Sequence, residues 1–401
     1  MCVLSDVLRS MRPEEDRSMS SQSTVAESLR LKFVADAKDL AECVGIAASV
    51  APAKATRPVL QSVLLRAEDG VVEVTGSDME VAVRVRFEQV EVGQDGALLL
   101  NAARFQQILR ELAGERVEIT ANERGVCTIS TSDASFQIMG EEAEAYPEQA
   151  PWPAEGVFRL GAKELVGMIR RTHFAAHPEK TRYAMNGILL DLRERRLHLV
   201  ATDGKRLALC ERELPEEVAA PVHVVVPTKG MNLLPRVLEE GDAFVEIAVG
   251  PAQVFFRTPK ALVTARLVEG HFPPYEEVLP KGHDKVLTLP RESFLCALRR
   301  ASILGTKDSQ SVRFAFDREG LELTARVPEV GASRVRFPLD YPFDPLSVGF
   351  NPAFFVDVLK VLATPEVRLE LKDPKSPAVI REGSDDGWSF VYLVMPLNLE
   401  G

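Results

Sequence analysis

Few side chains in this sequence are spaced to do catalytic or metal chemistry. His173 and His177 are the one pair of histidines at the i, i+4 spacing that places two imidazoles on one helix face. The sequence identifies no third ligand, so exposed imidazoles are the favoured interpretation. Asp203 lies in ATDGKR, where an Asp-Gly pair is typical of a tight hairpin turn. Motifs of phosphate-binding loops, dinucleotide-binding folds, zinc proteases and serine hydrolases are absent, so we expect no catalytic residue and no metal.

The cysteines also argue against metal and disulfide chemistry. They are Cys2, Cys43, Cys127, Cys210 and Cys296. An odd number of distant cysteines without a CxxC pair predicts free thiols, no cofactor and a reducing, cytoplasmic compartment. With 46% hydrophobic and 27% charged residues, the composition is that of a globular protein without membrane spans. Residues 1–30 are rich in Ser and charge and lack the apolar core of a signal peptide, so we expect a disordered N-terminal extension.

The elements that position these residues repeat along the chain. Six segments have the apolar periodicity and the start signals of amphipathic helices. They open at Asp36, Asn101, Gly161, Pro227, Pro290 and Asn351, at intervals of 65, 60, 66, 63 and 61 residues. Between them the apolar pattern changes to period two with turn signals, which predicts antiparallel strands. Pro235, inside the fourth segment, should kink or interrupt that helix.

The repeated unit predicts the domain organisation. Each repeat unit has one helix and several strands. Six such units, joined two by two, predict three similar α+β domains, each with two helices packed on antiparallel sheets. The stretches near 144–156 and 271–285 are rich in proline and charge and mark the seams. We therefore expect a first domain at 31–150, a second at 151–280 and a third at 281–401. Residue identity between the units is low, so the repeat is one of pattern.

Charge is segregated between the helices and the rest of the chain. The sequence has 48 basic and 59 acidic residues, a formal charge of −11, which disfavours a uniformly cationic nucleic-acid binder. The six helical segments contain twelve basic and nine acidic residues and so sum to +3. If all six helices lie on one side of their sheets, they form a mildly basic concave surface on an acidic body. For any single Lys or Arg, a solvated helix face is the simpler explanation.

Several motifs, in their order and spacing, resemble a known family. They are MNGILL (185–190), VATDGKRLAL (200–209), VVPTKG (225–230), FPPYEEVLPK (272–281), GFNPAFFVDVL (349–359) and YLVMPL (392–397). Together they make the chain, from Leu31 to Leu399, similar to the beta sliding clamps of bacterial DNA polymerase III. The resemblance implies the DNA clamp fold, a head-to-tail homodimeric ring around double-stranded DNA, and a non-catalytic processivity subunit. Twelve helices with axes about 9–10 Å apart would leave a hole of about 26 Å, wide enough for a duplex.

The expected DNA contacts combine basic residues of the helical segments with two loops that the resemblance implies, at Lys54 and at His177–Arg182. They are Lys54, Arg104, Lys163, Arg170, Arg171, His177, Lys180, Arg182, Lys229, Arg299 and Arg300. Because phosphate contacts carry no base information, binding is expected to be independent of DNA sequence and weak enough for sliding.

The resemblance also implies a pocket between the second and third domains that docks a short peptide of its partners. These partners would be the DNA polymerase III catalytic subunit, the clamp loader, and other polymerases and repair proteins. The pocket residues would be Met185, Thr202, Gly204, Arg206, Leu207, Pro273, Val278, Asn351, Phe354, Val394, Met395, Pro396 and Leu397. Apolar walls suit apolar anchors, and Arg206 and Asn351 can orient a peptide backbone. Glu277 and Ser309 differ from residues that relatives often carry, so the peptide preference stays open.

The subunit interface that the resemblance implies joins the third domain of one copy to the first domain of the other. Ile303 and Leu304 of the third domain would meet Phe136 and Ile138 of the first domain of a second copy. The segment SFQIMG (135–140) alternates like a strand, and an exposed edge strand is what a head-to-tail interface needs.

Two other functions remain open at this point. One is a cytoplasmic hydrolase with a pocket between α+β domains that uses Asp203 and His177. The other is a repeat-domain adaptor that binds no nucleic acid. A hydrolase would lose activity on replacement of a single Asp or His, a clamp would lose retention on circular DNA, and an adaptor would show neither property.

Overall fold

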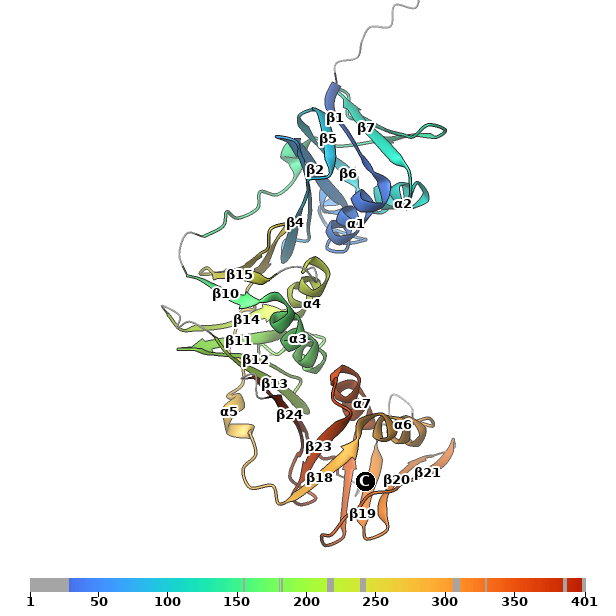
Figure 1. Ribbon diagram of the computed structural model, residues 1–401, viewed down its shortest axis with the longest axis vertical. Helices are drawn as coiled ribbons and strands as arrows, with labels where there is room; N and C mark the ends of the chain where they lie inside the picture. The colour runs from blue at the N-terminus through green and yellow to red at the C-terminus, as the bar shows by residue number, and fades with distance from the viewer. Residues whose placement is uncertain are drawn as a thin grey trace, which may run out of the picture.

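The computed structural model describes residues 29–153, 156–179, 181, 183–214, 220–238, 243–305, 311–328, 330–384 and 388–398 (Figure 1). Residues 1–28 of the expected extension, together with Lys180, Arg182 and Ser309, lie outside this part of the chain. Leu29 and Arg30, expected to be disordered with the extension, instead begin the strand Leu29–Asp36. The predicted α+β class is confirmed, because helices alternate with antiparallel strands along the described chain.

Six helices lie at the predicted positions. They are α1 (Ala37–Ala48), α2 (Ala102–Glu111), α3 (Ala162–Thr172), α4 (Thr228–Val237), α6 (Arg291–Ala301) and α7 (Pro352–Val361). Each begins directly after its predicted opening residue, and the side chains of Asp36, Asn101 and Asn351 accept hydrogen bonds from first-turn N–H groups. α4 is not interrupted at Pro235 but ends two residues later, because a proline in the last turn disturbs little of the helix. The short α5 (Tyr275–Val278) was not predicted.

The described strands form four sheets. The first, in spatial order, is β5 (Val90–Gln94), β1 (Leu29–Asp36), β7 (Arg116–Asn122), β8 (Val126–Ser130) and β9 (Ser135–Met139). The second is β10 (Val157–Gly161), β15 (Phe244–Val249), β16 (Gln253–Arg257), β17 (Ala261–Arg266), β4 (Val81–Phe87), β3 (Val71–Ser77), β2 (Ser62–Glu68) and β6 (Gly96–Asn101). The third is β14 (Val222–Pro227), β11 (Gly187–Arg193), β12 (Arg196–Thr202), β13 (Arg206–Glu213), β25 (Trp388–Val394), β24 (Ala378–Ser384), β23 (Glu366–Leu371) and β18 (Lys285–Pro290). The fourth is β21 (Gly331–Phe337), β20 (Gly320–Val327), β19 (Val312–Asp317) and β22 (Leu346–Phe350).

Two of these sheets cross from one domain into the next. β4 of the first domain pairs with β17 of the second, and β13 of the second pairs with β25 of the third. Each junction is therefore a continuous ladder of backbone hydrogen bonds, which holds neighbouring domains in a fixed orientation.

The helices lie along one side of a curved molecule and the sheets form its other side (Figure 1). Each helix turns an apolar stripe toward the sheets and a polar stripe outward. In α3, for example, Leu165 and Ile169 are buried whereas Lys163 and Arg170 are exposed. The arrangement predicted from the sequence, with the six helices on one side, is confirmed, and α5 lies on the opposite, convex side.

Candidate functional site

The concave surface carries exposed basic side chains on its helices. Arg104 on α2, Lys163 and Arg170 on α3, and Arg299 and Arg300 on α6 are all exposed. None of these five side chains forms an ion pair with another described residue, so their charges are open to solvent. Lys54 is also exposed, in the segment between α1 and a 3-10 turn at Pro58–Gln61.

Two predicted DNA contacts hold the domains together instead. The Arg171 side chain is 16% exposed, donates to Glu382 Oε2 at 2.9 Å and lies 4.5 Å from the ring centre of Trp388. Lys229 forms an ion pair with Asp78 and donates to the Val50 carbonyl oxygen at 3.0 Å, across the first junction. Since these charges are already neutralised, we leave Arg171 out of the DNA surface and assign Lys229 a reduced role.

The Arg171–Glu382 pair gives a test of the second junction. Replacing Glu382 by Gln should lower the free energy of unfolding by about 2 to 4 kcal/mol, because it leaves a largely buried guanidinium without its counter-charge. Glu246→Gln is the matched control, since Glu246 pairs with exposed Arg159 and Arg257 and should cost about 1 kcal/mol or less. Chemical denaturation measures both variants. Equal midpoints would contradict a stabilising role for the buried pair.

The histidines do not form a metal pair. α3 ends at Thr172 and His173 begins a 3-10 turn (His173–Ala175), so His173 and His177 do not share a helix face. Burial lowers the pKa of His173, against the attraction of Asp357. His177 Nδ1 lies 2.9 Å from the Glu179 carbonyl oxygen. Among the described residues, no group of three His, Cys, Asp or Glu side chains is placed to hold a metal ion.

Asp203 has a structural partner for each carboxylate oxygen. Oδ1 accepts hydrogen bonds from the backbone N–H groups of Lys205 and Arg206, at 2.9 and 3.0 Å, and Oδ2 accepts from Arg206 Nε at 3.0 Å. Gly204 follows with φ of +83°, a value that favours glycine. The predicted hairpin turn between β12 and β13 is therefore confirmed.

The four described cysteines, Cys43, Cys127, Cys210 and Cys296, are free, as predicted. Burial raises the pKa of the Cys127 and Cys210 thiols to about 12 in each case. A thiol with so high a pKa is protonated at neutral pH and is a poor nucleophile or metal ligand.

Arg206 lies where three elements of the second and third domains meet. Its Nη1 donates to Asp357 Oδ2 of α7 at 2.7 Å, and its Nη2 donates to the carbonyl oxygen of Phe174 at 2.7 Å. The guanidinium also stacks 4.5 Å from the ring centre of Phe354, and the side chain is 12% exposed. Because Nε is bound to Asp203 as well, Arg206 fixes the junction beside the predicted pocket more than it is free to orient a peptide backbone.

The C-terminal segment contains three residues of the predicted pocket, Met395, Pro396 and Leu397. The Met395 N–H donates to the Lys205 carbonyl oxygen at 2.9 Å, and the Leu397 N–H donates to the Gly349 carbonyl oxygen at 2.7 Å. The segment thus connects the second domain to β22 of the third, with Met395 45% exposed and Pro396 half-buried.

Other predicted pocket residues surround this segment. Leu207 and Val394 are buried in the paired strands β13 and β25, and Thr202 donates its hydroxyl to the Arg206 carbonyl oxygen at 2.7 Å. Asn351 caps α7, so its Oδ1 is already an acceptor for the Ala353 N–H at 3.0 Å. Met185 is half-buried next to β11.

The linker before the third domain completes the convex side of this region. Val278, at the end of α5, is 54% exposed, and Pro273 is half-buried. Between them Tyr275 packs in one apolar cluster with Leu207 and Leu393. The structure thus brings linker, sheet and C-terminal residues of the predicted pocket into one region.

The predicted interface residues lie at opposite ends of the molecule. Phe136 is 37% exposed on the edge strand β9, where Ile138 is half-buried. Ile303 is 78% exposed after α6, and Leu304 lies close to Gly331 at the start of the other edge strand, β21. Figure 1 shows β21 at one end of the molecule and the sheet of β1 and β7 at the other, so the two sets of residues do not meet within one copy.

The hairpins of the first and third domains share residues as well as shape, which the sequence analysis missed. Glu73 faces Arg86 and Thr75 faces Arg84 between β3 and β4. In the third domain the same four residue types face each other between β20 and β21; they are Glu322, Thr324, Arg334 and Arg336. The signal in the sequence is an ExT segment followed by RVRF, at 73–87 and again at 322–337.

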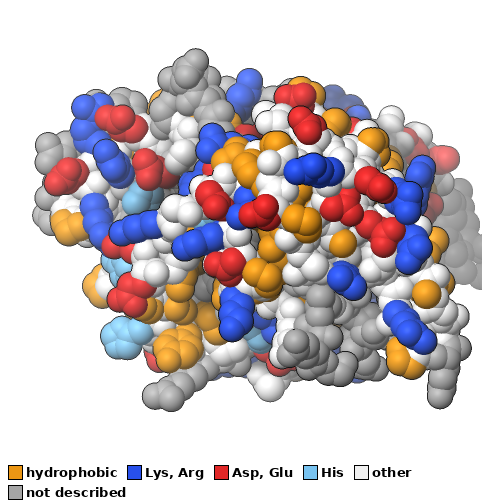
Figure 2. Space-filling view, turned by 90° about the horizontal axis from the view of Figure 1, so that it is seen from below, with side chains coloured by type: hydrophobic (Ala, Val, Ile, Leu, Met, Phe, Trp, Pro, Cys, Tyr) orange, Lys and Arg blue, Asp and Glu red, His pale blue; other side chains and the backbone are white. Residues whose placement is uncertain are grey.

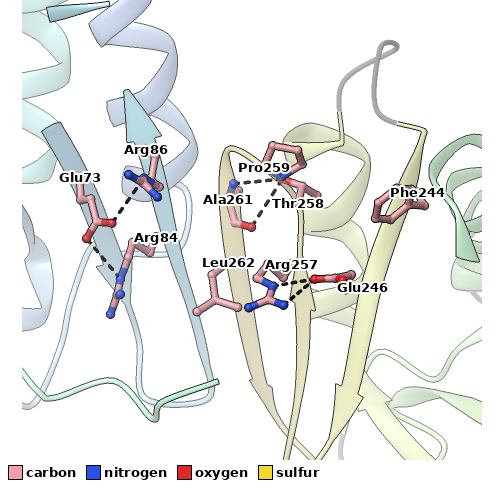
Figure 3. A pocket seen from close by; sticks show the side chains of 10 residues that line it. All are labelled: Glu73, Arg84, Arg86, Phe244, Glu246, Arg257, Thr258, Pro259, Ala261 and Leu262. Atoms are coloured by element: carbon pink, nitrogen blue, oxygen red, sulfur yellow. Dashed lines mark hydrogen bonds and ion pairs between the residues drawn. The ribbon is translucent and has the colours of Figure 1, made fainter. Parts of the chain in front are cut away.

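A cleft of about 450 Å³ lies where β4 meets β17 (Figure 3). Glu73 lies 3.8 and 3.9 Å from Nε of Arg84 and Arg86, and Glu246 accepts from Arg257 Nε at 2.8 Å on the other side of the seam. Hydrogen bonds from Arg159 and Arg257 hold the pKa of Glu246 below its usual value. These carboxylates are paired with arginines, so the cleft is a charged seam between the first and second domains.

The end of the molecule formed by the third domain has mixed surface chemistry. Figure 2 shows basic and acidic side chains interspersed there, with apolar side chains between them. Such alternation is typical of a surface that does not attract DNA strongly. No helix in the described part of the chain is long and apolar enough to span a membrane.

Comparisons with known proteins agree with this geometry. Family models of the DNA polymerase III beta subunit match in three consecutive parts: the N-terminal domain at residues 31–150, the central domain at 159–274 and the C-terminal domain at 276–398. The beta sliding clamps of Pseudomonas putida and Escherichia coli K12 are each 31% identical, over 92% of this chain and 100% of theirs.

Solved structures give the same result. The DNA polymerase sliding clamp of Pseudomonas aeruginosa is 30% identical with a TM-score of 0.82, over 92% of this chain and 100% of that one. The sliding clamp of Bacillus subtilis is 26% identical with a TM-score of 0.84, over 92% and 99%. With similarity along nearly its whole length and the same three-domain fold, the chain belongs to the family of bacterial beta sliding clamps, the beta subunits of DNA polymerase III.

Proposed function

We propose that two copies of this chain close head to tail into a ring that encircles duplex DNA and tethers DNA polymerase III during synthesis. The observation that carries the proposal is the position of the six long helices along the concave side, with the sheets outside (Figure 1). A second copy that continues the curve would surround a central opening with twelve helices. We retain 31–150, 151–280 and 281–401 as the proposed limits of the three domains.

The junctions inside the chain support strand pairing between the copies. β4 and β13 are each the second strand of a hairpin, and each pairs with the last strand of the following domain, β17 or β25. β21 is the second strand of the corresponding hairpin in the third domain, and β9 is the last strand of the first-domain sheet. Both are edge strands in the described part of the chain. We therefore propose that β21 pairs with β9 of the partner subunit.

The shared hairpin residues support a register for this pairing. Arg84 faces Leu262 across the first junction. The turns that precede β17 and β9 are alike, since in each a threonine hydroxyl accepts from an alanine N–H, at 3.0 Å for Thr258 and 3.1 Å for Thr131. By this equivalence Arg334 would face the partner's Ser135, and Ser333 would face the partner's Phe136.

The same register would bring the predicted apolar residues together. The Ser333 hydroxyl donates to the Ala301 carbonyl oxygen at 2.6 Å, at the end of α6. Ile303 follows two residues later and is 78% exposed. The partner's Phe136 would therefore lie near Ile303, and its burial would be worth roughly 1.5 to 3 kcal/mol.

The proposed DNA surface consists of exposed cations that bind no base. It comprises Lys54, Arg104, Lys163, Arg170, Arg299 and Arg300, with lesser contributions from His177 and Lys229; Lys180 and Arg182 remain as predictions. Few contacts to phosphate, made through solvent, favour sliding over tight binding. A closed ring retains DNA by enclosing it, so strong contacts are unnecessary.

Partner proteins are proposed to dock in the pocket between the second and third domains. Val278 and Met395 are exposed apolar side chains that can receive apolar anchors of a peptide, and Leu207 packs in one buried cluster with Tyr275 of the linker. The partners would be the polymerase catalytic subunit, the clamp loader and other polymerases and repair proteins. We propose no catalytic role, and the structural bonds of Asp203 favour this over a hydrolase.

Retention on DNA tests the proposed function. The purified protein, loaded on nicked circular DNA by a clamp loader complex, should remain bound through gel filtration, and linearising the DNA should release it. Equal retention on circular and linear DNA would contradict enclosure. Failure to bind either form would favour an adaptor, and hydrolysis lost on Asp203→Asn would favour an enzyme.

A further inference from the structure

A second apolar core lies under the linker that joins the second and third domains. It lies on the opposite face of the third sheet from α3. Its buried residues come from β11, β12, β13, β14, β24 and β25, from the linker, and from Ala184 before β11. Phe272 and Leu279 pack against it from either end of α5, and Tyr275, 4% exposed, is its only linker residue that is buried among those described. The linker therefore covers this face of the sheet, and Tyr275 is its side chain that enters the apolar core.

The Tyr275 hydroxyl reaches a row of charged residues at the margin of this core. It donates to Asp191 Oδ2 at 2.9 Å and lies 2.9 Å from His198 Nδ1. His198 Nε2 lies 3.0 Å from Glu211 Oε2. The four side chains therefore form one continuous hydrogen-bond network, from Asp191 through Tyr275 and His198 to Glu211.

Asp191 is the buried end of that hydrogen-bond network. It is 1% exposed, and it also faces Arg193, whose Nη2 donates to Oδ2 at 2.8 Å, and His223, whose Nδ1 lies 3.2 Å from Oδ1. Burial acts to raise the pKa of the carboxyl, but hydrogen bonds from His223, Tyr275 and Arg193 outweigh it and hold that pKa below its usual value. Arg193 also donates to Glu276 of α5 at 3.0 Å, a second tie to the linker.

The three hydrogen bonds of the network require three protons. Both carboxylates are acceptors only, the tyrosine hydroxyl supplies one proton, and a neutral imidazole supplies one more. All three hydrogen bonds can form together only when His198 carries a proton on both ring nitrogens. The order of charges is then negative, neutral, positive, negative, which lets Tyr275 donate to Asp191 while it accepts from His198.

We propose that Asp191, Tyr275 and His198 are positioning residues for partner binding: they fix the linker so that Pro273 and Val278 form one wall of the pocket. The inference rests on the proposed function, since it concerns the same pocket. Pro273 lies two residues before Tyr275 and Val278 lies three residues after it. Loss of the hydrogen bonds of Tyr275 therefore frees both residues. Binding of a partner must then order the linker again, which weakens affinity.

The test uses the full-length dimer and the catalytic subunit of DNA polymerase III as the probe. Tyr275→Phe keeps the ring in the apolar core and removes only the hydroxyl. It should speed amide hydrogen exchange in residues 272–279 and raise the dissociation constant about three- to tenfold, the effect of one or two hydrogen bonds. Tyr341→Phe is the matched control, because the buried Tyr341 hydroxyl has no hydrogen-bond partner among the described residues. This variant should match the unaltered chain.

The place of the faster exchange gives a readout that a general loss of stability would not reproduce. Tyr275→Phe should speed exchange in residues 272–279 and leave exchange in the fourth sheet unchanged, whereas a variant that only destabilises the fold would speed exchange in both. Each outcome decides one step of the proposal. Unchanged exchange in Tyr275→Phe refutes the anchor, equally faster exchange in the fourth sheet refutes a local role, and faster local exchange with unchanged affinity refutes the effect on the pocket. If the unaltered protein does not bind the polymerase, the proposed function fails, whereas the exchange measurement still decides the anchor.

Discussion

A chain in which proline replaces Arg334 is expected to be a monomer in solution, whereas the unaltered chain is expected to be a dimer. Arg334 corresponds to Arg84, and two residues after Arg84 the Arg86 N–H donates to the Lys260 carbonyl oxygen across the first junction at 2.8 Å. Because N–H groups two residues apart in a strand point to the same side, the Arg334 N–H should face the partner subunit. Proline removes that donor and leaves the other side of β21, which pairs with β20, intact.

Arg334→Ala is the matched control, since it removes the charge and keeps the N–H. It should remain a dimer by light scattering, and only the proline variant should be lost from nicked circular DNA. Circular dichroism would verify that both variants are folded. A dimeric, folded Arg334→Pro chain would refute the proposed pairing of β21 with β9.

Deleting Met395–Gly401 is expected to abolish binding of the polymerase without dissociating the dimer. The deletion removes the exposed Met395 and the two backbone hydrogen bonds that join this segment to Lys205 and Gly349. The proposed subunit interface lies in β9 and β21, which the deletion does not include, so it is left unchanged. Surface-immobilised polymerase and solution mass measure the two properties separately.

A shorter deletion of residues 398–401 serves as the control. It keeps Met395 and Leu397 with both of their hydrogen bonds, so polymerase binding should be retained. Full binding after the longer deletion would refute the pocket assignment. Dissociation of the dimer after the longer deletion would instead show that the segment supports the fold of the third domain.

The fold could be predicted from the sequence because its signals are local. Asp36, Asn101 and Asn351 cap helices through their own side chains, and the three helices begin at the next residue. Alternating apolar residues likewise mark strands such as β1, in which Leu31, Phe33 and Ala35 are buried. Sheets that cross domain boundaries could not be predicted, because strand partners such as β4 and β17 lie far apart in sequence.

The residues of the site could be predicted in part, and the wrong predictions have one cause. Residue types indicated basic helix faces, and exposed Arg104 and Lys163 agree with that prediction. The sequence alone does not show which cations already have a partner, and Arg171 is bound to Glu382, 211 positions away. For the same reason the sequence did not indicate the hydrogen bond between Tyr275 and Asp191, which lie 84 positions apart.

The shared sheets also limit how the molecule can be divided. A fragment containing only the central domain would lose the partners of both β17 and β13, one at each of its boundaries. Each exposed strand would be complementary to the other, since both normally complete a junction of the same kind. Such a fragment is therefore expected to grow into open-ended fibres, and its solubility depends on the neighbours that continue each sheet.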